Sequence, residues 1–120
     1  MRYHAVPWVV YTHPEVAGVG MTEGQAREQG RSIEVRSLPL RINGRFLAEH
    51  GNDPGVCKVI VNKKTGTLLG AQIVGSPASE IIHGVGAMIE AELRVKDIRE
   101  IVFPHPTVSE IVRDTIWTLE

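Results

Sequence analysis

The fold is decided by residues 56–74, which read VCKVIVNKKTGTLLGAQIV. Two runs rich in β-branched and apolar residues, 56–61 and 68–74, flank the segment Asn-Lys-Lys-Thr-Gly at 62–66. Such runs predict strands, and a short polar segment ending in glycine is typical of the loop between antiparallel strands. A turn signal, Asn-Asp-Pro-Gly at 52–55, precedes the first run. The sequence therefore predicts a β-hairpin within an antiparallel sheet.

Two further strands are predicted on the N-terminal side of this hairpin. The apolar and aromatic run at 6–12 ends at a His-Pro pair, and residues 32–40 alternate in polarity until they reach a proline. Together with the hairpin they predict a sheet of four strands.

The segment between these two strands predicts a loop and a short helix. Ala-Gly-Val-Gly at 17–20 predicts the loop, and Thr22 with Gln25 three residues later predicts the capping box of the helix. Gly30 is placed where helices usually end. Residues 41–48 are ambiguous between helix and loop.

The C-terminal half changes from the period of strands to the period of helices. Apolar residues recur at helical spacing over 78–92 and 108–119, and a short helix is predicted at 97–102. Thr107 is the predicted N-cap of the last helix. Strands followed by helices indicate an α+β fold, an antiparallel sheet with helices packed on one side.

Composition excludes several classes of protein. The chain has 120 residues, of which 42% are hydrophobic and 22% charged, and this is the size and make-up of one globular domain. Thirteen Lys and Arg face fourteen Asp and Glu, so the net charge is −1 and nothing predicts binding to nucleic acid or to a membrane surface. We find neither a signal peptide nor a membrane span, and we expect a cytoplasmic protein.

The chain contains one cysteine, Cys57. A single cysteine forms no intrachain disulfide and no cysteine metal cluster, so this chain by itself cannot carry out dithiol–disulfide chemistry. Cys57 falls in a predicted strand, where a buried and inert thiol is the expected state. The histidines at 4, 13, 50 and 83 show no metal-ligand spacing, and no metal site is predicted.

The segment at 104–110, Pro-His-Pro-Thr-Val-Ser-Glu, carries the candidate chemistry. His105 precedes a predicted helix and Glu110 lies in its first turn, so the carboxylate could hold one ring nitrogen and leave the other for acid/base work. Thr107 and Glu110 also fit a capping box, in which the carboxylate only caps the helix. Spacing alone favours the capping box, because such boxes are common.

Three ordered motifs resemble one family. Residues 11–23 (YTHPEVAGVGMTE), residues 69–75 with 80–82, and residues 105–110 resemble the C-terminal dimerisation domain of the pyridine nucleotide–disulfide oxidoreductases. The resemblance covers essentially all 120 residues, places the dimerisation domain at 6–120 and is strongest to the dihydrolipoamide dehydrogenases. Glutathione reductases typically carry a second acid after the glutamate, where this chain has Ile111.

The resemblance implies a function. Such enzymes are flavoprotein homodimers that pass electrons from dihydrolipoamide to a reactive disulfide, then to FAD, then to NAD+. His105 matches the base that each subunit supplies to its partner's active site, with its backbone close to the partner's FAD, and Glu110 matches the carboxylate that orients it. The peptide before Pro106 is commonly cis in the family. With the resemblance, the His–Glu pair is favoured over the capping box.

The FAD-binding domain, the NAD-binding domain and the paired redox cysteines are absent from this chain. We therefore expect one domain of a larger enzyme, inactive and without bound FAD or NAD by itself, with residues 1–5 as an added start or an inter-domain linker. One alternative is a stand-alone dimeric module that binds a 2-oxo acid dehydrogenase complex through its peripheral-subunit-binding domain. Another is the same domain of a different disulfide reductase, such as glutathione reductase.

Overall fold

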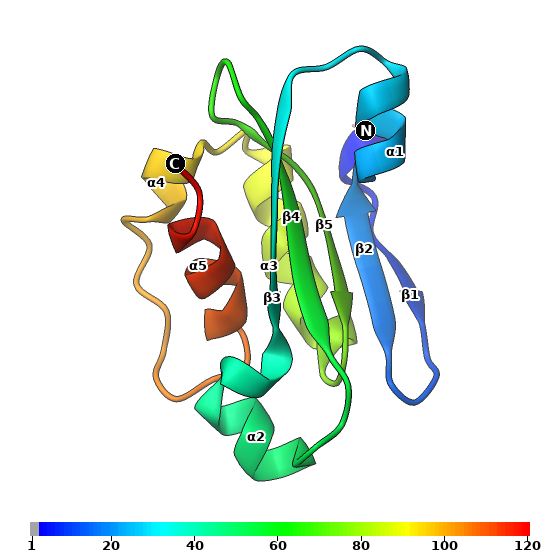
Figure 1. Cartoon of the computed structure of the whole chain (residues 1–120), viewed down its shortest axis with the longest axis vertical. Helices are drawn as coiled ribbons and strands as arrows, with labels where there is room; N and C mark the ends of the chain where they lie inside the picture. Colours follow the sequence, from blue (N-terminus) through cyan, green and yellow to red (C-terminus); the bar gives the residue numbers. More distant parts are fainter. Residues whose placement is uncertain (1–2) are drawn as a thin grey trace.

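The computed structural model describes residues 3–120, so the predicted segment 1–5 lies partly outside the described residues. Five antiparallel strands form one sheet in the order β1-β2-β5-β4-β3 (Figure 1). The strands are β1 (Trp8–Val10), β2 (Val16–Gly20), β3 (Ile33–Pro39), β4 (Val56–Asn62) and β5 (Leu68–Val74).

The β4–β5 hairpin is confirmed, and its loop has a clear physical basis. The side-chain oxygen of Asn62 accepts hydrogen bonds from the backbone N–H groups of Lys64 and Thr65, at 2.9 and 3.2 Å. Gly66 has a φ of 77°, a conformation that side-chain-bearing residues rarely adopt. The sequence therefore turns the chain at the predicted point.

The predicted loop at 17–20 was wrong, because these residues form β2. Gly18 and Gly20 have low intrinsic strand propensity, but β2 pairs with β1 on one side and β5 on the other. The Trp8 ring lies directly against Gly18, where a Cβ atom would overlap it. The glycines thus make room for neighbours within the sheet and do not mark a loop.

The helices α3 and α5 cover one face of the sheet (Figure 1). α3 packs on β2 and β5, and α5 packs on β3 and β4. This arrangement confirms the predicted α+β class. The helices and 3-10 turns are η1 (Tyr3–Ala5), α1 (Glu23–Glu28), η2 (Leu40–Ile42), α2 (Gly44–His50), α3 (Ala78–Glu90), α4 (Val95–Ile98) and α5 (Glu110–Trp117).

The core lies between these two helices and the sheet. Val59 and Ile73 from the sheet, Ile82 from α3 and Ile116 from α5 belong to one buried cluster. Each is almost completely inaccessible, so the burial of aliphatic side chains is the main stabilising contribution to the position of α5. The N-terminus of α5 is therefore held on a rigid base.

The helix ends differ in part from prediction. The capping box of Thr22 and Gln25 is confirmed, with both of its hydrogen bonds present. The ambiguous segment 41–48 contains the end of η2 and most of α2. The short helix predicted at 97–102 lies at Val95–Ile98 instead.

The predicted N-cap of the last helix, Thr107, was wrong. α5 begins at Glu110 after Ser109, and the Thr107 hydroxyl donates to the Pro104 carbonyl at 2.8 Å instead of capping. The Glu110 side chain accepts a hydrogen bond from the backbone N–H of Thr107, and the chain makes a further turn before the helix begins.

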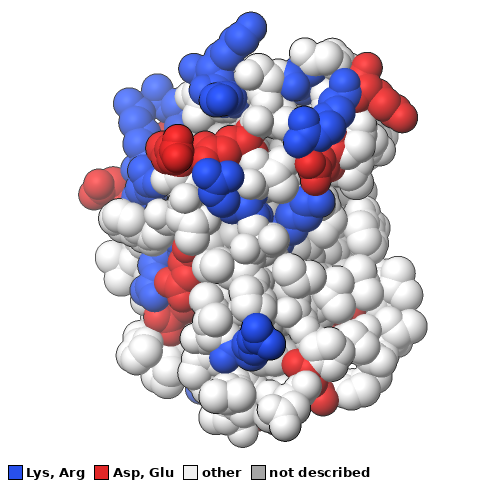
Figure 2. Space-filling model, viewed as in Figure 1, with Lys and Arg blue, Asp and Glu red and all other residues white. Residues whose placement is uncertain are grey.

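Charges of both signs are interspersed over the upper part of the face in Figure 2, and the lower part of that face is largely uncharged. Ion pairs join some of the charged side chains of the domain: Lys58 and Glu23 lie 2.8 Å apart, and Glu23 also pairs with Arg27 at 2.7 Å. Over residues 3–120, no helix is both long enough and apolar enough to cross a membrane.

Candidate active site

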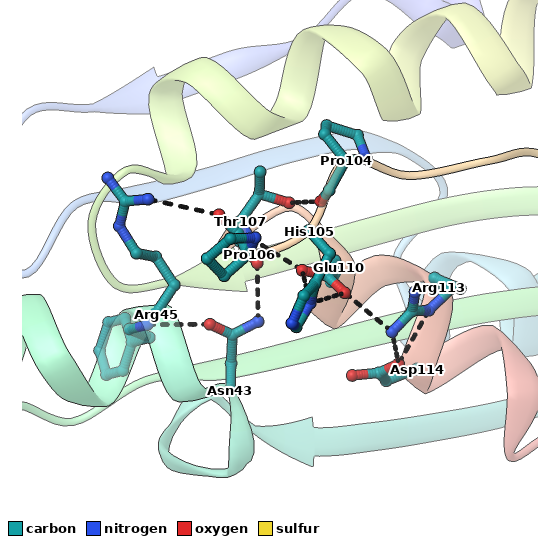
Figure 3. A network of polar contacts seen from close by, with 10 residues as sticks. Asn43, Arg45, Pro104, His105, Pro106, Thr107, Glu110, Arg113 and Asp114 are labelled. Carbon is teal, nitrogen blue, oxygen red and sulfur yellow. Dashed lines mark hydrogen bonds and ion pairs between the residues drawn. The ribbon is translucent and has the colours of Figure 1, made fainter.

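The loop between α4 and α5 brings His105 and Glu110 together. His105 Nδ1 lies 3.0 Å from both carboxylate oxygens of Glu110 (Figure 3). The Glu110 side chain is 7% exposed, whereas the His105 side chain is 80% exposed. A buried carboxylate thus holds one nitrogen of an accessible imidazole ring, and Nε2 is the nitrogen left for chemistry.

Glu110 is held by two more donors. The Thr107 N–H donates to Oε1 at 2.8 Å, and Arg113 Nη2 lies 3.1 Å from Oε2. The Thr107 N–H and His105 together hold the pKa of the Glu110 carboxyl below its usual value. The carboxylate therefore stays charged at neutral pH, accepts from Nδ1–H and fixes which ring nitrogen carries the proton.

The predicted His–Glu pair is present, because Glu110 contacts His105. The predicted capping box is present only by half: the Glu110 side chain accepts from the Thr107 N–H, but the Thr107 hydroxyl donates to the Pro104 carbonyl and does not cap the helix. The His105–Pro106 peptide is cis, as the resemblance implies.

Two residues of the ambiguous segment contact the His105 loop, and the sequence did not indicate them as site residues. Asn43 Nδ2 donates to the Thr107 carbonyl at 3.0 Å, and Arg45 Nη1 donates to the Pro106 carbonyl at 3.3 Å (Figure 3). Asn43 lies 64 residues before Thr107, so sequence spacing holds no signal for this contact.

The contact of Arg113 with Glu110 was also missed, although a signal for it exists. The two residues are three apart at the start of a helix, which places their side chains on the same face. Arg113 also pairs with Asp114 at 2.9 Å. The basic side chain therefore balances two acids and does not neutralise Glu110 alone.

The other candidate residues form no second site. Cys57 is buried, and burial raises the pKa of its thiol to about 11, which leaves it protonated and unreactive. His13 and His50 approach Asp53 at 3.7 and 3.9 Å. Within residues 3–120, no group of three or more His, Cys, Asp or Glu side chains could hold a metal ion.

Comparison with known proteins identifies the family. The family described as "Pyridine nucleotide-disulphide oxidoreductase, dimerisation domain" matches residues 6–116. The chain belongs to this family. Its resemblance in sequence and its fold class, both expected from the motifs, are thereby confirmed.

Curated relatives of the dimerisation domain are dihydrolipoyl dehydrogenases. That of Rhizobium etli is 42% identical over 92% of this chain, which covers 23% of the relative. That of Geobacillus stearothermophilus is 40% identical over 93% of this chain and 24% of the relative. The domain thus spans about a quarter of the length of the curated relatives it matches.

Solved structures show the same fold. The HOCl-induced flavoprotein disulfide reductase RclA from Escherichia coli matches with a TM-score of 0.90 at 36% identity, over 96% of this chain and 26% of that one. LpdA from Mycobacterium tuberculosis matches with a TM-score of 0.92 at 24% identity, over 100% of this chain and 26% of that one, and supports the fold alone.

Proposed function

We propose that this dimerisation domain supplies His105 as the acid/base group of a homodimeric flavoprotein that oxidises dihydrolipoamide with NAD+, with Glu110 orienting the imidazole. The observation that carries the proposal is the contact of His105 Nδ1 with both oxygens of the buried Glu110 carboxylate, on a ring that is open to a partner. The names of the relatives supply the substrate class.

The chemistry requires such a base. Oxidation of a dithiol to a disulfide releases two electrons and two protons. The substrate must first lose a thiol proton, because the species that attacks the reactive disulfide of such an enzyme is a thiolate. Nε2 of His105 accepts a thiol proton, and the Glu110 carboxylate stabilises the imidazolium that results. When bound, FAD supplies the electron acceptor and NAD+ the final oxidant.

The loop is compatible with a flavin carried by the partner subunit. The carbonyls of Pro104, Pro106 and Thr107 all accept hydrogen bonds from side chains of this domain. Over residues 3–120 no such bond engages the His105 carbonyl, so the His105 backbone is left available to a group outside the domain, as the resemblance implies.

The test uses His105→Gln in the full-length protein that carries this domain. We expect dihydrolipoamide oxidation to fall by about two to four orders of magnitude, the usual contribution of a general base, while FAD content and dimer formation stay unchanged. Steady-state kinetics with NAD+, flavin absorbance and light scattering make these measurements. Retained activity would overturn the assignment of the base.

The partner and the cellular compartment stay predictions. Binding to a peripheral-subunit-binding domain of a 2-oxo acid dehydrogenase complex is one, and a cytoplasmic location, expected from the sequence without a signal peptide or membrane span, is the other. The geometry does not favour the alternative of a stand-alone interaction module, because such a module has no use for an exposed imidazole held by a buried carboxylate.

A further inference from the structure

We propose that Asn43 is a positioning residue for the His105 loop, and that Arg45 supports it from the same turn. The inference rests on the proposed function, because it concerns where His105 lies when it acts as a base. The contacts come from the N-cap and first turn of α2, a part of the chain far from the proposed catalytic motif in sequence.

Asn43 is buried, and both ends of its amide are engaged. The residue is among the few buried polar ones described, at 5% exposure. The carbonyl oxygen accepts from the Phe46 N–H at 2.8 Å, which caps α2, and the amide nitrogen donates to the Thr107 carbonyl at 3.0 Å. One amide therefore joins the start of α2 to the loop that carries His105 (Figure 3).

The contact acts on the backbone that sets the His–Glu geometry. The Thr107 N–H is bound by Glu110 and its carbonyl by Asn43, so this residue is fixed from both sides. Arg45 donates to the neighbouring Pro106 carbonyl at 3.3 Å and also pairs with Glu49 on α2. His105 itself is mostly exposed, so its movement is limited by Glu110 and by the hydrogen bonds that hold the loop backbone.

Orientation of this kind has a large effect on rate. A displacement of about 1 Å at a reacting group can lower a rate by about a hundredfold. Loss of the Asn43 donor leaves the Thr107 carbonyl without its partner in a partly buried place, and the backbone will shift to regain one. We therefore expect the base to be misplaced although His105 and Glu110 are both present.

The alternative is that Asn43 matters only as the cap of α2, and the variants separate the two roles. Asn43→Ser keeps a good N-cap but is too short to reach the Thr107 carbonyl, whereas Asn43→Ala loses both contacts. Thr22→Ala removes the N-cap of α1 and serves as the matched control for lost cap stability alone. Arg45 is exposed, so Arg45→Met removes its hydrogen bond to the Pro106 carbonyl without changing the core.

The experiment measures the two halves of the reaction in the full-length flavoprotein. We expect Asn43→Ser to slow reduction of the flavin by dihydrolipoamide about tenfold, in kcat rather than KM, and Arg45→Met to slow it about threefold. Reduction of the flavin by NADH, which needs no thiol base, is expected to stay unchanged. Thr22→Ala is expected to change neither rate.

A double-mutant cycle decides between positioning and general destabilisation. If Asn43 acts through His105, Asn43→Ser costs little further rate in the His105→Gln background. Equal losses in both backgrounds, or equal slowing of both half-reactions, would overturn the inference. If His105→Gln alone leaves the dithiol step unchanged, the proposed function fails instead. If Asn43→Ser does not fold, Arg45→Met takes its place. An unchanged rate of flavin reduction by dihydrolipoamide in Arg45→Met then contradicts the proposed positioning of the His105 loop.

Discussion

Glu110 is the residue on which the candidate site depends. Three donors converge on one buried carboxylate, from His105, from the Thr107 backbone and from Arg113. A buried charge is stable only when it is paired and hydrogen-bonded, and these donors meet that condition. The residue therefore has a structural role that the domain needs even when no catalysis takes place.

This role gives a dependence on pH whose sign follows from the pKa of Glu110. The pKa is lower in the folded chain than the usual value of a glutamate carboxyl, so the ionised carboxylate stabilises the fold at any pH above that usual value. That stabilisation is lost as the pH falls through the lowered pKa. We expect Glu110→Gln to be clearly less stable than the parent near pH 7 and to approach it near pH 3.

Urea unfolding of both chains at several pH values measures the difference in the free energy of unfolding. Glu28→Gln, which removes an exposed carboxylate at the end of α1, is the matched control and is expected to change stability by less than about 0.5 kcal/mol. A difference in the free energy of unfolding between Glu110→Gln and the parent that is constant between acid and neutral pH contradicts the stabilising role of the ionised Glu110 carboxylate.

At the scale of elements, glycines have different roles that local sequence does not distinguish. A Cβ atom at Gly70 on β5 would overlap the backbone of Met21, whereas one at Gly84 on α3 would meet nothing within 4 Å. Gly70 therefore permits a close backbone approach, and Gly84 only weakens its helix.

These two positions form a matched pair of Gly→Ala variants. We expect Gly70→Ala to lower the free energy of unfolding by about 3 kcal/mol or more, because backbone must shift to admit the methyl group. Gly84→Ala is expected to raise it by about 0.5–1 kcal/mol through better helix propensity. Thermal and urea unfolding measure both, and a stable Gly70→Ala chain would contradict the close approach.

The same contrast explains which elements could be predicted. The β4–β5 hairpin and α3 were predictable because residue type, period and turn signals agree within each segment. β2 was not, because its glycines have a meaning only beside Trp8 on β1 and Gly70 on β5. α5 begins later than expected because the Glu110 side chain binds the Thr107 N–H before the helix starts.

The residues of the candidate site also differ in whether the sequence could predict them. His105 and Glu110 lie five residues apart, so a motif could predict their contact. Asn43 and Arg45 reach the same loop across 64 and 61 residues, and only the folded chain brings them there. Sequence thus predicts the pair that we propose does the chemistry, and the fold supplies the residues that contact its loop.

At the scale of the whole molecule, the reactivity of the single cysteine measures how readily the folded domain opens. Cys57 lies on β4 inside the core cluster, and burial raises the pKa of its thiol to about 11. The reactive thiolate is therefore scarce at neutral pH, and a reagent cannot reach the sulfur without an opening of the sheet. This is consistent with the proposal that the redox pair lies outside this chain.

Thiol labelling at neutral pH tests this directly. We expect Cys57 of the folded chain to react about a thousandfold or more slowly than in the urea-denatured chain, since reaction requires a cooperative opening that costs several kcal/mol. Cys57→Ala carrying Lys63→Cys, which places a thiol in the exposed β4–β5 loop, is the control and is expected to react rapidly when folded. If Cys57 reacts as fast as the loop cysteine, the sheet opens without global unfolding. The rigid base on which α5 and the His105 loop rest would then be lost as well, because the core that buries Cys57 is the one that holds α5.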